Sequence, residues 1–330
     1  MKREQFIIGV DLGGTNVVVG AMPVDGSREI GMRTLPTRAD MGAAGVADRI
    51  AAMIENVILD VRRQTGAERD DILGVGIGSP GPLDRERGIV IITPNLGWRN
   101  YPLRDEVANR VNLRATLDND ANCATLGEWW CGAAKGGRNV VGLTIGTGIG
   151  GGLILDGRLY HGASDAAGEI GHTSIDSTGR RCKCGNYGCL EAYCGGPAIA
   201  DRAREAIESE ESPILMSLVD NDPSRITAHI VYEAAKQGDL VAREVVRDTA
   251  RFLGAGLSNL INIFNPDTVV LAGGVTQAGD ALFTPLRAEI KRRAFKPAVE
   301  ACRIVPGSLP VSAGVVGAVA TFKMQVLGSI

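Results

Sequence analysis

The sequence has few aromatic residues, few histidines and no excess of charge of either sign. Phe, Tyr and Trp together make up 4% of the 330 residues, there are three histidines, and the formal net charge is −3. A balanced charge gives neither a basic surface for nucleic acid nor an acidic tail. No segment reaches the roughly 18 uninterrupted apolar residues of a membrane span. The composition therefore predicts a globular protein with neither a nucleic-acid nor a membrane partner.

The cysteines and the N-terminus indicate a reducing compartment. The chain has seven cysteines, an odd number. The apolar run after MKREQ is interrupted at Asp11, so it is too short for a secretory signal and reads as a strand. We therefore expect a cytoplasmic protein without a disulfide framework.

Glycine is abundant and unevenly placed. The 44 glycines concentrate in DLGGTN, GVGIGSPGP, TIGTGIGGG and LAGGV, several of them after short apolar runs. Such placement suggests backbone brought close to a ligand. The order of elements is a strand hairpin followed by alternating strands and helices, and this order occurs twice, with a weak repeat between IIGVDLGGTNVVVGAM and VVGLTIGTGIGGGLIL. The pattern predicts two α/β domains with mixed sheets and a boundary near residues 115–120.

Helices are expected from the spacing of apolar residues. The period of Val46, Ile50, Ile54, Val57 and Val61 predicts a helix that ends at Gly66. Further helices are expected at 121–134, 197–211 and 311–326.

Two of the glycine turns are candidate phosphate sites. Successive backbone N–H groups can enclose an anion, and DLGGTN and GTGIGGG each add a hydroxyl, so the two turns could hold one polyphosphate between them. The alternative is ordinary hairpin chemistry. Gly146, Gly148 and Gly151 also match the dinucleotide pattern, but the following GLILDGRLY alternates like a strand where that motif needs a helix. No GxxxxGK[ST] occurs, which excludes a P-loop.

TLDNDANCATLGE places acids where a strand gives way to a helix. Ligand sites in α/β sheets gather at such strand ends, and a carboxylate there could take a proton from a hydroxyl during phosphoryl transfer. The alternative is a helix N-cap. We expect the cap for Asp118 or Asn119, and both interpretations stay open for Asp120.

The spacing of His172, Cys182, Cys184 and Cys189 predicts a metal site. Three thiolates and one imidazole make a closed tetrahedral set, so the ion would be a structural Zn²⁺. Free thiols or a redox pair are the alternatives. The other two histidines, His161 and His229, belong to no cluster and are expected to be surface or satisfied polar residues. Glu169 and Glu191 flank the four predicted ligands. A rigid metal site could hold the two carboxylates against the vicinal hydroxyls of a sugar, although either could be a solvated surface residue.

These motifs together resemble the ROK family of bacterial sugar kinases and repressors, and most of all its glucose-phosphorylating members. DLGGTN and GTGIGGG are similar to its two phosphate motifs, LAGGV to its adenosine-side motif, and GEIGH with CKCGNYGCLE to its zinc signature; GSPGPLD and NLGW fit its sugar-side loops. The resemblance covers essentially the whole chain. It implies an actin-like fold of the hexokinase and ribonuclease H-like type, with two α/β domains around a cleft.

The resemblance also implies roles for individual residues. Asp120 would be the base for the sugar 6-hydroxyl, with ATP and Mg²⁺ as cofactors and a structural Zn²⁺. The sugar contacts would be Gly78, Asn95, Asn119, Asp120, Glu169, His172 and Glu191. The residues near the nucleotide, its phosphates and Mg²⁺ would be Asp11, Gly13, Gly14, Thr15, Asn16, Gly146, Thr147, Gly148, Gly273 and Gly274. The last helix would return to the first domain, which gives domains at 1–118 with 312–330 and at 119–311.

The expected activity is phosphorylation of glucose at the 6-hydroxyl in a homodimer or homotetramer. The alternatives are a kinase for N-acetylmannosamine, N-acetylglucosamine or another hexose, and a non-catalytic sugar-responsive regulator. The regulator is disfavoured because the first phosphate motif begins at Asp11, which leaves no room for a preceding DNA-binding segment. ADP or polyphosphate could replace ATP as the phosphate donor.

Overall fold

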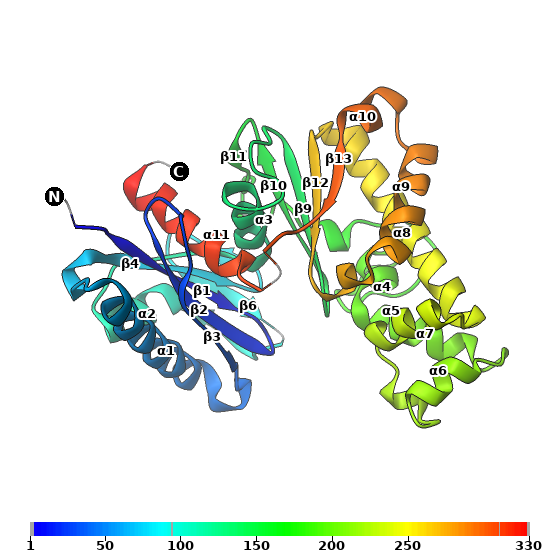
Figure 1. The fold of residues 1–330 in the computed structure, drawn as a ribbon, viewed down its shortest axis with the longest axis horizontal. Helices are drawn as coiled ribbons and strands as arrows, with labels where there is room; N and C mark the ends of the chain where they lie inside the picture. Colours follow the sequence, from blue (N-terminus) through cyan, green and yellow to red (C-terminus); the bar gives the residue numbers. More distant parts are fainter. Residues whose placement is uncertain (1–2, 94, 310, 329–330) are drawn as a thin grey trace. The chain divides into compact units, whose positions relative to one another are not determined.

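A computed structural model describes residues 3–93, 95–309 and 311–328 (Figure 1). The chain forms two compact units, and each is described by itself. Unit 1 takes in the described residues up to Gly137, Gly152–Gly168 and those from Gly307 on; unit 2 takes in Arg138–Gly151 and Glu169–Pro306. These limits differ from the expected boundary near residues 115–120, because the helix that follows that point packs mainly against the last helix of the chain, which belongs to the same unit. Where the domains of the working protein divide stays a prediction.

Unit 1 is built on a mixed five-stranded sheet in the order β3-β2-β1-β4-β8. The hairpin of β1 and β2 is antiparallel, as predicted, and β4 and β8 continue parallel to β1. The elements of unit 1 are β1 (Phe6–Leu12), β2 (Asn16–Pro23), β3 (Ile30–Pro36), α1 (Gly42–Thr65), β4 (Ile72–Ser79), β5 (Leu83–Asp84), β6 (Ile89–Thr93), β7 (Trp98–Tyr101), α2 (Leu103–Val111), β8 (Ala115–Asn119), α3 (Asp120–Trp130), β11 (Arg158–Leu159) and α11 (Ala313–Phe322). Strand β10 (Ile149–Leu155) begins in unit 2 and continues into unit 1.

Alternation along β1 divides the core of unit 1 into two layers. Phe6, Ile8 and Val10 join a cluster with apolar residues of α1 and α2, whereas Ile7 packs with Val316, Val319 and Phe322 of α11. Because successive side chains of a strand point to opposite faces, one strand supplies both layers. The result is a sheet with helices on both faces (Figure 1).

Helix α11 lies unusually close to the sheet and to α3. A Cβ at Gly76 of β4 would collide with the carbonyl of Ala318, and one at Gly317 would collide with the carbonyl of Cys123. Glycine at these positions therefore lets backbone pack on backbone. The glycine of GVGIGSPGP at position 76 was expected near a ligand; its physical role here is helix packing.

The start of α11 is tied to α3 by a buried carboxylate. Glu128 is 1% exposed. Its Oε2 accepts hydrogen bonds from Ala133 N at 2.9 Å, Ser308 N at 3.0 Å and Ser308 Oγ at 3.3 Å, and its Oε1 accepts one from Leu309 N at 2.8 Å. Both oxygens are thus fully used as acceptors, which only a carboxylate allows.

Glu128→Gln is expected to lower the free energy of unfolding by about 2 kcal/mol, because the amide nitrogen would face an N–H donor in a buried place. Urea denaturation measures the difference. The exposed Glu210→Gln is the matched control and should change stability little. Equal stabilities for the two variants would contradict this account.

Unit 2 combines parallel strands with long helices. Strand β12 pairs in parallel with β9 and with β13. Its longest helix, α8, buries a continuous apolar stripe and packs on α9 (Figure 1). The remaining bounds are β9 (Val140–Ile145), α4 (Glu191–Cys194), α5 (Gly196–Ala206), α6 (Pro213–Leu218), α7 (Ala228–Gln237), α8 (Leu240–Phe264), β12 (Thr268–Ala272), α9 (Asp280–Arg293), α10 (Lys296–Ala301) and β13 (Arg303–Pro306).

Most elements expected from the sequence are present, with shorter ends. Helix α1 stops at Gly66, whose φ of 74° ends it as predicted. Helices α3 and α5 end earlier than expected, at Trp130 and Ala206, whereas α11 ends at Phe322 and continues as a π-helix over Lys323–Leu327. Among the described residues, no helix is both long and apolar enough to cross a membrane.

Candidate active site

The candidate site of unit 1 lies at the carboxyl ends of three parallel strands. In the register of the sheet, Asp11 of β1 pairs with Gly78 of β4, and Gly78 pairs with Asp118 of β8. A Cβ at Gly78 would lie 3.5 Å from the Cα of Asp120. Residues from well-separated parts of the sequence therefore meet at one edge, where α/β sheets bind ligands.

The helix α3 begins directly at this edge, and its cap is Asn119. The Asn119 side chain accepts hydrogen bonds from Ala121 N at 2.9 Å and Asn122 N at 3.1 Å. The cap interpretation is thus confirmed for Asn119 and wrong for Asp118, which is fully buried and makes other contacts. Asp120 is the first helical residue, where the helix dipole favours a negative charge.

Asp11 and Asp120 influence each other. Burial, with a further contribution from the Asp120 carboxylate, raises the pKa of Asp11 to about 7. The Asp11 carboxyl is buried, and the Asp120 carboxylate lies close enough to act on its pKa. Carboxylate oxygens are ligands that Mg²⁺ prefers, so the residues present fit a divalent cation.

The first glycine turn, 13–16, is held in shape by Thr37. Thr37 donates its hydroxyl hydrogen to the Gly13 carbonyl at 2.7 Å, and its N–H to the Thr15 carbonyl at 2.8 Å. Gly14 faces Asn95: a Cβ at Gly14 would lie 3.5 Å from that of Asn95. The turn predicted for phosphate and the residue predicted for sugar are therefore neighbours in unit 1. Thr15 and Asn16 are exposed.

Unit 2 contains a cavity beside its own glycine turns. Strands β9 and β12 are parallel neighbours, so Gly146 and Gly273, which follow them, lie at the same edge. A cavity of about 770 Å³ is lined by Gly146, Thr147 and Gly274. This volume suits a ligand of nucleotide size. The second turn is followed at once by β10, so the helix that a dinucleotide motif requires is replaced by a strand.

Several side chains of this cavity were missed in the sequence. Arg204 of α5 and His229, Tyr232 and Lys236 of α7 line it. Burial raises the pKa of Tyr232, whose Oη has no hydrogen-bond partner within the described part of the chain. A buried protonated hydroxyl is available to donate to a ligand. These residues belong to amphipathic helices without a motif, so no sequence pattern indicated their role; His229 had been expected only as a surface or satisfied polar residue.

The predicted metal ligands come together. The ligand atoms of His172, Cys182, Cys184 and Cys189 all lie within 4.8 Å of one another. Cys184 Sγ is 3.7 Å from Cys189 Sγ, and Cys182 Sγ is 3.8 Å from His172 Nδ1. A zinc tetrahedron with metal–sulfur bonds of about 2.3 Å has edges of about 3.8 Å, so the residues fit the ion.

Glu191 connects the segment of these ligands to the second glycine turn. Its Oε2 accepts a hydrogen bond from Ile149 N at 2.9 Å. A Cβ at Gly148 would lie 2.5 Å from the same oxygen, so only glycine fits there without displacing the carboxylate. The other predicted carboxylate, Glu169, is exposed, with its Oε2 4.0 Å from His172 Nε2.

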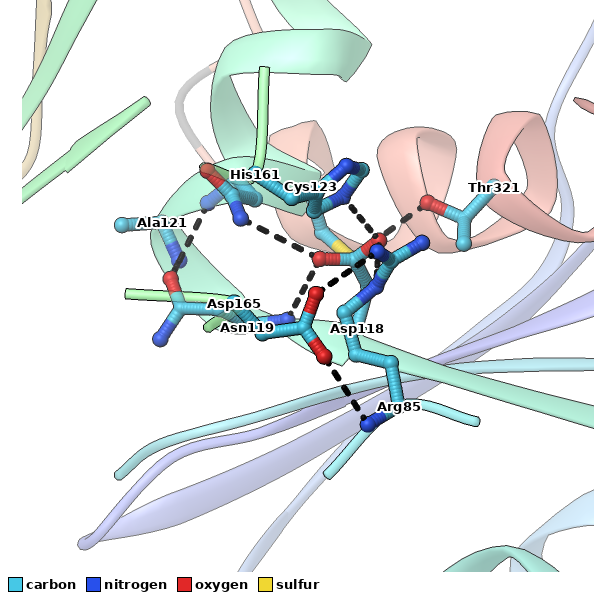
Figure 2. A network of polar contacts seen from close by, with 9 residues as sticks. Arg85, Asp118, Asn119, Ala121, Cys123, His161, Asp165 and Thr321 are labelled. Carbon is cyan, nitrogen blue, oxygen red and sulfur yellow. Dashed lines mark hydrogen bonds and ion pairs between the residues drawn. The ribbon is translucent and has the colours of Figure 1, made fainter. Parts of the chain in front are cut away.

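The buried acid Asp118 has partners that the sequence did not indicate. Its Oδ2 accepts from Arg85 Nε at 3.0 Å and lies 2.9 Å from His161 Nε2 (Figure 2). Arg85 Nη1 also donates to Asp165 Oδ1 at 3.1 Å. His161 is thus the satisfied polar residue that was expected, but as part of a cluster that was not.

Comparisons with known proteins identify the family of this chain. The ROK family profile matches residues 7–325. A glucokinase of Thermotoga maritima is 38% identical over 98% of both chains, and a xylose repressor of Caldicellulosiruptor bescii is 33% identical over 97% of this chain and 78% of the repressor. The crystal structure of a ROK family glucokinase from Streptomyces griseus in complex with glucose and AMPPNP is 34% identical, with a TM-score of 0.81 over 96% of this chain and 98% of that one. This chain therefore belongs to the ROK family.

Proposed function

We propose that this protein is a glucokinase that transfers the γ-phosphoryl group of ATP to the 6-hydroxyl of glucose. The observation that carries the proposal is the full-length similarity to a glucokinase bound to glucose and an ATP analogue, in a chain that has Asp120 at a sheet edge and a nucleotide-sized cavity. One solved structure named as an N-acetylmannosamine kinase, from Listeria monocytogenes, is less similar, at 23% identity.

In this proposal Asp120 is the general base. The 6-hydroxyl oxygen forms a bond to the γ-phosphorus, the bond from that phosphorus to the bridging oxygen breaks, and the hydroxyl proton passes to the Asp120 carboxylate, which leaves glucose 6-phosphate and ADP. Mg²⁺ would neutralise charge on the phosphates when bound. Asp11 is the residue suited to that ion, and the backbone N–H groups of both glycine turns are suited to phosphate oxygens.

The sugar contacts of this proposal are the predicted ones, and they remain a prediction: Gly78, Asn95, Asn119, Asp120, Glu169, His172 and Glu191. Asn119 uses its carbonyl oxygen as the helix cap, so its amide nitrogen is the group left for a sugar hydroxyl. In unit 2 the nucleotide partners are the second glycine turn, Gly273, Gly274 and the side chains of the cavity. A structural Zn²⁺ on His172, Cys182, Cys184 and Cys189 completes the proposal.

A panel of sugars with ATP tests the function. Glucose, mannose, N-acetylglucosamine and N-acetylmannosamine are compared by ADP release, and glucose 6-phosphate is identified with its dehydrogenase. ADP and polyphosphate replace ATP in parallel reactions. ADP release with an N-acetylhexosamine and none with glucose would contradict the proposal.

A non-catalytic regulator is the second candidate, since a repressor is among the relatives. A DNA mobility-shift assay with and without sugar, run beside the kinase assay, separates the two. We also propose a cytoplasmic location, which the seven free cysteines support, and a homodimer or homotetramer, which sedimentation velocity would test.

Gly148→Ala is expected to raise the KM for glucose about tenfold, because the added methyl group displaces the Glu191 carboxylate, and a lost hydrogen bond to a charged group has about that effect. Steady-state kinetics at saturating ATP measure it. Gly146→Ala is the matched control in the same turn, since a Cβ there meets nothing within 4 Å. Both variants change the proposed phosphate turn, so weaker ATP binding in both is compatible with this account. An equal KM for glucose in the two would contradict a role of Glu191 in the sugar site.

A further inference from the structure

Arg85, Asp118, His161 and Asp165 form a compact polar group in unit 1, here called the Arg85 cluster (Figure 2). Arg85 bridges the two carboxylates: Nε donates to Asp118 at 3.0 Å and Nη1 to Asp165 at 3.1 Å. Its backbone N–H donates to Asp165 at 3.2 Å as well. The cluster thus joins three segments that are far apart in the sequence.

The cluster is largely removed from water. The side chain of Asp118 is 1% exposed and that of Arg85 is 20% exposed. Taking charges out of water is costly, and the mutual attraction of a buried pair often does no more than offset this cost. A contribution to stability alone therefore does not explain the Arg85 cluster. The position of the cluster in the fold indicates a second role.

Asp118 binds residues on both sides of Asp120 in the chain. Its Oδ1 accepts hydrogen bonds from the backbone N–H of Asn119 at 2.8 Å and from the side-chain amide of Asn122, two residues after Asp120, at 3.2 Å. Its Oδ2 is the atom held by Arg85 and His161. One rigid carboxylate therefore fixes the first turn of α3, and the cluster fixes that carboxylate.

The third segment of the cluster bears on the sugar side. Asp165 lies in the loop between His161 and Gly168. The residue after Gly168 is Glu169, a predicted sugar contact. Asp165 has φ of 56°, a left-handed conformation that Asp tolerates better than most residues. Its two bonds to Arg85 hold the loop in this conformation.

We propose that the Arg85 cluster is a positioning device for the base: Arg85, through Asp118, sets the orientation of Asp120 against the sugar hydroxyl. This inference rests on the proposed function. None of the cluster residues touches reacting atoms in this proposal, so they are positioning residues. A displacement of a catalytic group by about 1 Å can lower the rate about a hundredfold.

Arg85→Met removes the bridge while keeping an unbranched apolar chain. We expect kcat with glucose to fall about 10- to 100-fold, by the cost of misplacement, while the KM for ATP changes less than about twofold. Hydrogen–deuterium exchange of the peptide 117–125 should become faster, because the first turn of α3 loses its anchor. Arg87→Met, a substitution of an exposed neighbouring arginine, is the matched control and should resemble the wild type.

Arg85→Lys separates positioning from stability. Lysine keeps the charge but not the fork that reaches two carboxylates, so we expect the melting temperature to recover more than kcat does. Should Arg85→Met fail to fold, Asp165→Asn, at the more exposed end of the cluster, serves in its place with the same readouts. Wild-type kcat in a folded variant overturns the inference, and so does a loss of activity that follows only the unfolded fraction.

The failure of this inference and that of the proposed function can be told apart. If the wild type phosphorylates no sugar of the panel, the function fails, while exchange in residues 117–125 still reports whether the cluster anchors α3. If the wild type is active and Arg85→Met is equally active with unchanged exchange, only the positioning role fails.

Discussion

Asp120→Asn is expected to lower kcat with glucose about 10³-fold, the middle of the range for the loss of a general base. The amide is isosteric with the carboxylate but cannot accept the proton of the 6-hydroxyl. It can still hydrogen-bond the hydroxyl, so the dissociation constant for glucose should change less than tenfold. Steady-state ADP release gives kcat, and calorimetric titration with glucose gives the affinity.

The control for Asp120→Asn is Asp105→Asn, which changes an exposed acid in the first turn of α2. It removes the same charge from the first turn of another helix. Any loss of activity that comes only from a weakened helix N-terminus should therefore appear in this control as well. A kcat within tenfold of the wild type for Asp120→Asn would remove Asp120 as the base. A large loss in both variants would show that the effect is structural.

Asp11→Asn tests the neighbouring carboxylate and should behave differently. Because we assign Asp11 to Mg²⁺, its replacement is expected to raise the Mg²⁺ concentration needed for half-maximal rate, and excess Mg²⁺ should restore part of kcat. Excess Mg²⁺ should not rescue Asp120→Asn. The same Mg²⁺ response in the two variants would contradict the separate roles.

Features that depend on neighbouring residues in the sequence were predictable. The two strand–turn–strand hairpins, the end of α1 at Gly66 and the ROK family membership were confirmed. The ligands His172, Cys182, Cys184 and Cys189 span only 18 positions, so their spacing alone indicated that they could converge, as they do. Short-range patterns carry this information because turns, caps and metal loops are local.

Features that depend on tertiary packing were not predictable from one sequence. Arg85 meets Asp118 and Asp165 across 33 and 80 residues, and nothing in the surrounding letters marks any of them. Gly76 lies in one of the glycine-rich stretches that were interpreted as close to a ligand, although the carbonyl of Ala318 on a helix more than 200 residues later explains it. The cap was expected at Asp118 or Asn119; Asn119 forms it, and the partners of Asp118 could not be seen in the sequence.

Cys184→Ser is expected to abolish stoichiometric zinc binding and to raise the KM for glucose at least tenfold. The segment 176–188 contributes few apolar side chains to the core, so ligation is the main interaction that can hold it. Structural zinc sites contribute about 10–16 kcal/mol of apparent binding free energy in small domains, far more than such a segment can obtain from packing. Serine oxygen is a much weaker zinc ligand than thiolate.

The effect should reach the sugar site through Glu191, which begins α4 two residues after Cys189 and hydrogen-bonds Ile149 N. When the segment loosens, this carboxylate loses its fixed position and the second glycine turn loses a partner, so glucose binding weakens first. Elemental analysis gives the zinc content, and kinetics before and after chelation give the KM. Cys302→Ser changes a cysteine outside the cluster, so its zinc content and its KM for glucose should equal those of the wild type. A wild-type zinc content in Cys184→Ser, or an unchanged KM in metal-free protein, would show that the four residues do not support the sugar site through a metal.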